Sequence, residues 1–205
     1  MANLQAVPES ASKEPADITQ QAWSTLERGA RDRRAGLHTL TLSTTGLDGY
    51  PEARTVVLRY ADRSAREIRF HTDVRSTKFR EMTVEPKVAL LGYDASSKLQ
   101  LRLKGFVRLH TKNDVALAAW KASQPQSLMC YRQPEAPSLA VASALPAPDM
   151  RGLSFKPEDG FENFAVVGVT IRSLEWLYLS RLGHQRIRFS YDQSGVEGEP
   201  QWLAP

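Results

Sequence analysis

The stretch Leu99-Gln-Leu-Arg-Leu-Lys-Gly105 alternates apolar and polar residues without interruption. In an extended strand successive side chains point to opposite faces, so the three leucines share one face and Gln100 shares the other with Arg102 and Lys104. The apolar pattern continues past Gly105 to His110, and a glycine inside a strand indicates a bulge or bend. This pattern predicts a long antiparallel strand, and the bend is typical of a barrel.

Other strand-like segments lie on both sides of this stretch. They span residues 37–43, 52–60, 67–72, 88–93, 164–171, 175–179 and 185–191. The first three are joined by short turns, which indicates an antiparallel meander. About eight short strands, with two or three helices beside them, predict a mainly β protein, a barrel with peripheral helices.

Helices are predicted from Asp17 to about Arg34, over 76–85 and over 114–123. The proline-rich segment 124–162 is too long for a structureless loop in a compact domain, so it is expected to be partly helical, a functional lid, or disordered. We expect residues 1–17 to form a flexible N-terminal tail and residues 18–205 to form a single domain.

The composition disfavours several classes of protein. The 27 basic and 23 acidic residues give a charge of +4, spread along the chain, and aromatic residues are only 8% of the total and not clustered. A nucleic-acid-binding barrel is therefore not expected. One cysteine and four scattered histidines predict no metal site. The sequence has no apolar run of membrane-spanning length and no signal pattern, so a cytoplasmic protein without membrane contact is expected.

Two segments are candidates for an anion site. Arg54-Thr-Val-Val-Leu-Arg59 places an arginine at each end of an apolar strand, which suits an elongated ligand or is simply a strand flanked by solvated charges. Phe70-His-Thr-Asp-Val-Arg-Ser-Thr-Lys78 joins a strand end to a helix start. Free N–H groups, hydroxyl groups and a lysine suit a phosphate there, although an ordinary N-cap by Ser76 is the alternative.

Two further segments are weaker signals. Gln100 carries an amide that both donates and accepts hydrogen bonds, which suits the edge of a heterocycle such as a flavin ring. Trp176 lies ten residues before Arg186, in the segment Arg181-Leu-Gly-His-Gln-Arg186. A core tryptophan followed by a basic hairpin loop explains this pattern equally well.

Together, these four segments resemble the pyridoxamine 5'-phosphate oxidase family in order and spacing. The family's strand Arg-x-Val-Leu-Leu-Lys, its loop Phe-Tyr-Thr-Asn-x-x-Ser-Arg-Lys and its strand Arg-Gln-Val-x-x-x-Gly have counterparts at 54–59, 70–78 and 99–105. Its C-terminal Trp and His-Asp-Arg correspond to Trp176 and His184-Gln-Arg186, and the ending Leu203-Ala-Pro205 also matches. The resemblance covers roughly residues 37–205.

The resemblance implies an FMN-binding split barrel that forms a homodimer with FMN between the subunits. It implies that FMN is bound by Arg54, Val57, Leu58, Arg59, His71, Thr72, Ser76, Thr77, Lys78, Gln100, Trp176 and Arg186. It also implies His184 and Arg186 as catalytic residues, and Arg59, Ser127, Arg181 and His184 as contacts to a small-molecule substrate.

The implied activity is an oxidoreductase, in which a substrate passes a hydride to flavin N5 and oxygen or another acceptor reoxidises the flavin. The family grips its substrate phosphate with a Lys, a Tyr, an Arg and a Ser, which correspond here to Arg59, Ala119, Ser123 and Ser127. A further family arginine corresponds to Leu182, one residue from Arg181. The substrate therefore stays open, and the alternative is a non-catalytic flavin-binding module, a store or a sensor.

Overall fold

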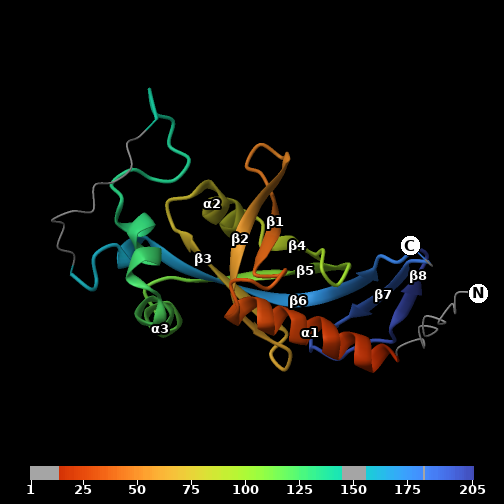
Figure 1. Cartoon of the computed structure of the whole chain (residues 1–205). Helices are drawn as coiled ribbons and strands as arrows, with labels where there is room; N and C mark the ends of the chain where they lie inside the picture. Colours follow the sequence, from red (N-terminus) through yellow and green to blue (C-terminus); the bar gives the residue numbers. More distant parts are fainter. Residues whose placement is uncertain (1–13, 145–155, 182) are drawn as a thin grey trace, which may run out of the picture.

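The computed structural model describes residues 14–144, 156–181 and 183–205. Its eight strands form one antiparallel sheet in the order β3-β2-β1-β4-β5-β6-β7-β8. Because β3 also pairs with β6, the first six strands of that order close into a barrel (Figure 1). The strands are β1 Thr39–Thr45, β2 Pro51–Asp62, β3 Glu67–Asp73, β4 Lys87–Asp94, β5 Leu99–His110, β6 Phe164–Tyr178, β7 Gln185–Ser190 and β8 Gln201–Leu203.

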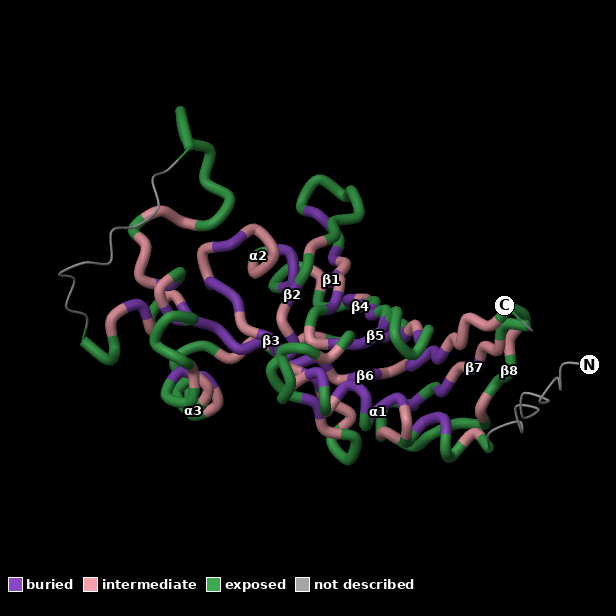
Figure 2. Tube along the Cα trace, in the orientation of Figure 1, coloured by how far each residue is buried: buried purple, intermediate pink, exposed green. Residues whose placement is uncertain are grey.

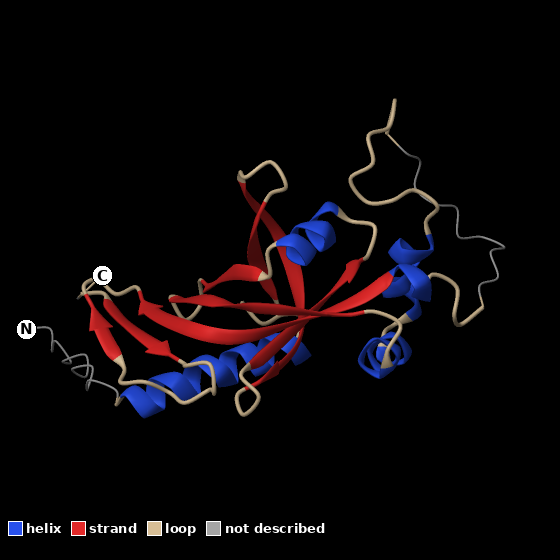
Figure 3. Ribbon diagram, turned by 180° about the vertical axis from the view of Figure 1, so that it is seen from behind, coloured by secondary structure: helices blue, strands red, loops and turns tan. Residues whose placement is uncertain are grey.

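Helical segments surround this barrel. They are α1 Pro15–Arg31, α2 Thr77–Val84, α3 Asp114–Ala122 and the short 3-10 helices η1 Pro125–Arg132 and η2 Phe161–Asn163. In Figures 1 and 3, α3 and η1 lie at one end of the β6 ribbon, whereas β7 and β8 lie at the other end. The mainly β barrel with peripheral helices is therefore confirmed, and so is the meander of β1, β2 and β3.

The predicted bend at Gly105 is also confirmed. The register between β5 and β6 shifts between Lys104 and Gly105. A Cβ at Gly105 would lie 2.3 Å from the carbonyl oxygen of Thr170, so no other residue fits this close approach of two strands. The bend lets β5 turn around the barrel while it pairs with β6 along its whole length.

The main core fills the barrel and continues under α1 (Figure 2). The three leucines of the opening stretch are buried there, as the alternation predicts. Ile18, Trp23 and Leu26 bury one face of α1 in the same cluster. A second, smaller cluster joins α3 and η1 to the start of β6. In it the rings of Trp120 and Phe164 meet edge-on, with their centres 5.2 Å apart. This second cluster fixes α3 beside the barrel.

The structure corrects several predicted boundaries. Segments 164–171 and 175–179 are one strand, β6. Ser173 pairs with both neighbouring strands and Arg172 is the extra residue at the register shift, so a bulge, and not a turn, separates the two segments. The helix expected from Asp17 begins at Pro15 and ends at Arg31. The three-residue strand β8 was not predicted. Within 124–162, η1 and η2 confirm partial helicity, whereas 145–155 and residues 1–13 of the expected tail lie outside the described residues.

Candidate functional site

Two adjoining cavities lie where β2 and β3 meet the helices. The first, the α2 cavity, has a volume of about 390 Å³ and is lined by β2, the end of β3, Lys78 of α2 and the η1 segment. The second, the α3 cavity, has a volume of about 580 Å³ and lies between the same strands and α3. Arg59, His71, Ser123 and Ser127 line both, so the two cavities form one continuous site.

The loop between β3 and α2 builds one wall of the α2 cavity. The Ser76 hydroxyl donates to the Asp73 carbonyl oxygen at 2.7 Å and lies 3.2 Å from the Thr72 hydroxyl. It makes no cap bond to α2, so the first N–H groups of the helix, at Thr77 and Lys78, have no side-chain cap. Ser76 is 1% exposed. The Ser76 hydroxyl therefore holds the loop, and its predicted contact to FMN stays a prediction.

Arg54 lies behind this wall and does not line either cavity. Its guanidinium donates to the Thr44 hydroxyl and, at 2.8 Å, to the Glu81 carboxylate of α2. The Thr44 hydroxyl donates to the same carboxylate at 2.6 Å. The predicted contact of Arg54 with FMN stays a prediction: its guanidinium is engaged by the buried Glu81 carboxylate, and its positive charge lies near Lys78.

Lys78 is the cation that α2 presents to the cavity. In the described part of the chain, Lys78 makes no ion pair. Burial lowers the pKa of its ammonium group, and the nearby positive charge of Arg54 lowers it further. Such a site gains stability from an anion, since a bound anion opposes both effects. Asp73 also lines the cavity, but Arg75 binds its carboxylate at 2.7 Å, so its charge is compensated.

Arg59 and His71 line the boundary between the two cavities. Burial lowers the pKa of His71 to about 4, and the positive charge of Arg59 adds to this effect. The His71 ring is therefore neutral at neutral pH, and it rests edge-on against Phe164 at 4.8 Å. Val57 and Thr72, two of the residues predicted to bind FMN, also line the α2 cavity. Leu58 does not, because its side chain faces the barrel core.

The remaining predicted residues lie on the other half of the sheet. Gln100 pairs with Leu177 in the ladder, and Leu177 pairs with Arg186, so these three share one face of β5, β6 and β7. On the same face the buried Glu175 carboxylate accepts a hydrogen bond from Nε of Arg186 at 2.8 Å. Neither Gln100 nor Arg186 lines the two cavities. A single chain therefore does not bring the two predicted groups together.

The last predicted positions surround the turn before β7. Trp176 is 3% exposed and packs in the barrel core, 5.9 Å from the ring of Tyr178, on the opposite face from Arg186. Arg181 is exposed, and the His184 ring accepts a hydrogen bond from the Ser180 N–H at 3.2 Å. Leu182 lies outside the described residues. The functional roles expected of these residues stay predictions.

Several lining residues were not predicted from the sequence. Cys130 and Tyr131 of η1 line the α2 cavity. Cys130 is exposed, whereas burial raises the pKa of the Tyr131 hydroxyl. Tyr60 and Arg69 line the α3 cavity. The η1 residues lie in a segment without periodicity, so nothing in the sequence marks them. Arg69 alternates with the core residues of β3, a signal that a face assignment of this strand would have used.

The comparisons with known proteins agree with this geometry. The model of the pyridoxamine 5'-phosphate oxidase FMN-binding domain matches residues 20–111. A pyridoxine/pyridoxamine 5'-phosphate oxidase of Xanthomonas campestris pv. campestris is 30% identical over 168 residues, which are 75% of this chain and 79% of that protein. The chain belongs to the pyridoxamine 5'-phosphate oxidase family. The matched domain is the family's FMN-binding domain, which confirms FMN as the predicted cofactor.

Further relatives and solved structures match different shares of this chain. The oxidase of Thermosynechococcus vestitus is 35% identical over 113 residues, 50% of this chain and 53% of that protein, so this match spans about half the relative's length. An FMN-binding protein of Nostoc punctiforme, described as pyridoxamine 5'-phosphate oxidase-related, has a TM-score of 0.74 at 20% identity, covering 95% of this chain and 99% of that one. PhzG of Burkholderia lata has a TM-score of 0.68 at 19% identity, covering 98% of both chains. These structures confirm the split-barrel fold.

The donor set of the α2 cavity fits the phosphate end of FMN. A phosphate monoester carries about −1.5 to −2 charges near neutral pH and binds several cations and N–H donors. Lys78 supplies a cation without an ion-pair partner among the described residues, the start of α2 supplies N–H groups, and Arg59 adds positive charge at the boundary with the α3 cavity. The site thus holds, at one strand–helix junction, the groups expected of a mononucleotide site.

Proposed function

We propose that this chain is an FMN-dependent oxidoreductase that acts as a homodimer. The observation that carries the proposal is the junction of β3 and α2. There the Lys78 ammonium group, which has no ion-pair partner among the described residues, and the start of a helix face one cavity. Thr72 and Lys78 would hold the FMN phosphate, with Arg54 and Glu81 keeping α2 in place. When bound, FMN supplies the redox chemistry by accepting a hydride from the substrate.

The protein's own residues position the reactants and control the electrostatics. Arg59 and the neutral His71 ring form the boundary between the α2 cavity and the α3 cavity. The α3 cavity would then receive the substrate beside the flavin. A neutral His71 leaves Arg59 as the positive group at this boundary, so an anionic part of the substrate would be drawn towards it.

The second subunit would supply the groups that a single chain places too far away. Gln100 and Arg186 share one sheet face, and Glu175 fixes the Arg186 side chain. We propose that this face completes the flavin site of the partner subunit, as the spacing of these residues in the family implies. His184 and Arg181, at the turn before β7, would then approach the substrate from the partner side.

The test is purification followed by an absorption spectrum, mass identification of the molecule released on denaturation, and peroxide detection with a panel of amines and carboxylates. Released FMN, bleaching by dithionite and turnover of any substrate are expected. A protein that is colourless and does not bind added FMN would contradict the proposal. Bound FMN that is never reduced by a substrate would favour the non-catalytic module.

A further inference from the structure

The α3 cavity has an apolar wall made by one face of α3. Val115, Ala118, Ala119 and Ala122 follow the helical repeat and all line this cavity. Three of the four are alanines, so the helix surface contributes little side-chain volume and leaves room for a ligand. A cavity of about 580 Å³ is within the range that accommodates small organic molecules.

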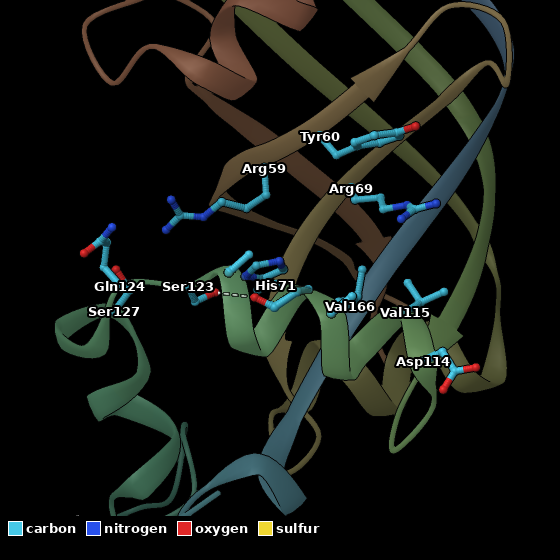
Figure 4. A pocket seen from close by; sticks show the side chains of 13 residues that line it. Arg59, Tyr60, Arg69, His71, Asp114, Val115, Ser123, Gln124, Ser127 and Val166 are labelled. Carbon is cyan, nitrogen blue, oxygen red and sulfur yellow. Dashed lines mark hydrogen bonds between the residues drawn. The ribbon is translucent and has the colours of Figure 1, made fainter. Parts of the chain in front are cut away.

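The two arginines that line this cavity, Arg59 and Arg69, differ in direction and in their partners. Figure 4 shows Arg59 extending towards Gln124 and Ser127, whereas Arg69 points the opposite way. In the part of the chain that the structure describes, Arg59 makes no ion pair. Arg69 is engaged by two partners. Its Nε and Nη2 donate to the two carboxylate oxygens of Glu67 at 2.7 and 3.1 Å, and its guanidinium lies 4.5 Å from the centre of the Tyr60 ring.

The other polar groups around the cavity add little positive charge. The Ser123 hydroxyl donates to the Ala119 carbonyl oxygen at 2.8 Å. Asp114 lies at the far end of α3 from Arg59 (Figure 4), so its negative charge disfavours an anion at that end. The cavity therefore offers one uncompensated cation at one end and an apolar wall along its length.

We infer that the α3 cavity takes a small monocarboxylate with an apolar body, its carboxylate bound by Arg59 and its body against the alanine face of α3. This rests on the proposed function, in which the α3 cavity is the substrate side. A guanidinium matches a carboxylate with two parallel hydrogen bonds. A phosphate monoester, with nearly twice the charge, needs further cations, and at the positions equivalent to the family's Tyr and Arg grips this chain has Ala119 and Ser123.

The test uses FMN-loaded protein and isothermal titration with three ligands that share one body: 2-naphthoate, 2-naphthamide and 2-naphthyl phosphate. We expect 2-naphthoate to bind at least about tenfold more tightly than the amide, and the phosphate ester to bind no more tightly than the carboxylate. FMN loading is measured first, so a failure of FMN binding is distinguished from a failure of the carboxylate site. A phosphate ester that bound tenfold more tightly would overturn the inference.

Variants separate the cation from the apolar wall. Arg59→Gln should lower the affinity for 2-naphthoate by about tenfold or more and leave the affinity for 2-naphthamide unchanged. The matched control is Arg69→Gln with Glu67→Gln, which removes the paired arginine of the same cavity without changing net charge and should leave both affinities unchanged. Ala122→Trp, on the alanine face that lines the cavity, should lower the affinity for both ligands while FMN stays bound. Equal losses for acid and amide in Arg59→Gln would contradict the role of Arg59.

Discussion

Nη2 of Arg54 lies 2.8 Å from Oε2 of Glu81, a carboxylate whose side chain is 2% exposed. The pair joins β2 to α2, and the Thr44 hydroxyl of β1 completes it. Three elements of the barrel therefore meet at one buried ion pair, directly behind the cavity wall that Lys78 completes. The position of α2, and with it the cation of the proposed phosphate site, depends on this contact.

Removal of one partner of this pair should destabilise the fold. Glu81→Gln leaves the Arg54 guanidinium, which is 22% exposed, with only the Glu52 carboxylate at 3.7 Å, a change that should cost about 1–3 kcal/mol. Chemical denaturation measures the free energy of unfolding. The double variant Arg54→Gln with Glu81→Gln should lose less unfolding free energy than the two single variants lose together. Strictly additive losses would show that the two side chains do not interact.

Substitution of Lys78 should weaken the binding of FMN without unfolding the protein. Lys78→Gln removes a half-buried cation with no ion-pair partner in the described residues, and loss of a charge-assisted hydrogen bond lowers affinity by about tenfold or more. Quenching of FMN fluorescence measures the dissociation constant. The matched control is Lys87→Gln, an exposed lysine at the start of β4 that pairs with Glu85. Equal affinities for the two variants would remove Lys78 from the phosphate site.

The depressed pKa of His71 makes stability depend on pH. The folded-state pKa is about 4 and the ordinary value is 6.5. Between pH 4 and pH 6.5, His71 is therefore protonated in the unfolded chain and neutral in the folded chain. Stability is therefore lost as pH falls from about 6.5 to 4, by up to about 3 kcal/mol. The measurement is the difference in unfolding free energy between wild type and His71→Gln at pH 7 and pH 4. Parallel profiles would show that His71 titrates normally.

A shared flavin site predicts complementation between variants. Lys78→Gln and Arg186→Gln should each lower FMN binding, and mixed refolding of the two chains should restore about a quarter of the wild-type sites, because half of the dimers are hybrids and each hybrid has one intact site. Visible absorption of bound flavin after gel filtration measures the recovery. The control is each variant refolded alone. Absence of recovery in hybrid dimers would mean that both residues act within one chain.

The strand pattern of this protein was predictable from local sequence. Alternation at Leu99–Lys104 assigns faces because side chains along a strand alternate, and the glycine at 105 marks the bend without any tertiary information. The break expected between 171 and 175 was wrong because local polarity does not distinguish a turn from a bulge within a long strand. That distinction is made by β5, which pairs with β6 from Val166 to Tyr178.

The sequence by itself determined the barrel, the family resemblance, and the strand end and helix start that bear Thr72 and Lys78, because these depend on residue types at short, fixed spacings. Only the tertiary structure decided which charges are available. It engages Arg54 with Glu81, 27 residues along the chain, and it leaves Arg59 without an ion-pair partner among the described residues at the boundary of two cavities. Compensation of these two charges depends on distances to residues far along the chain, and those distances are fixed only when the barrel closes.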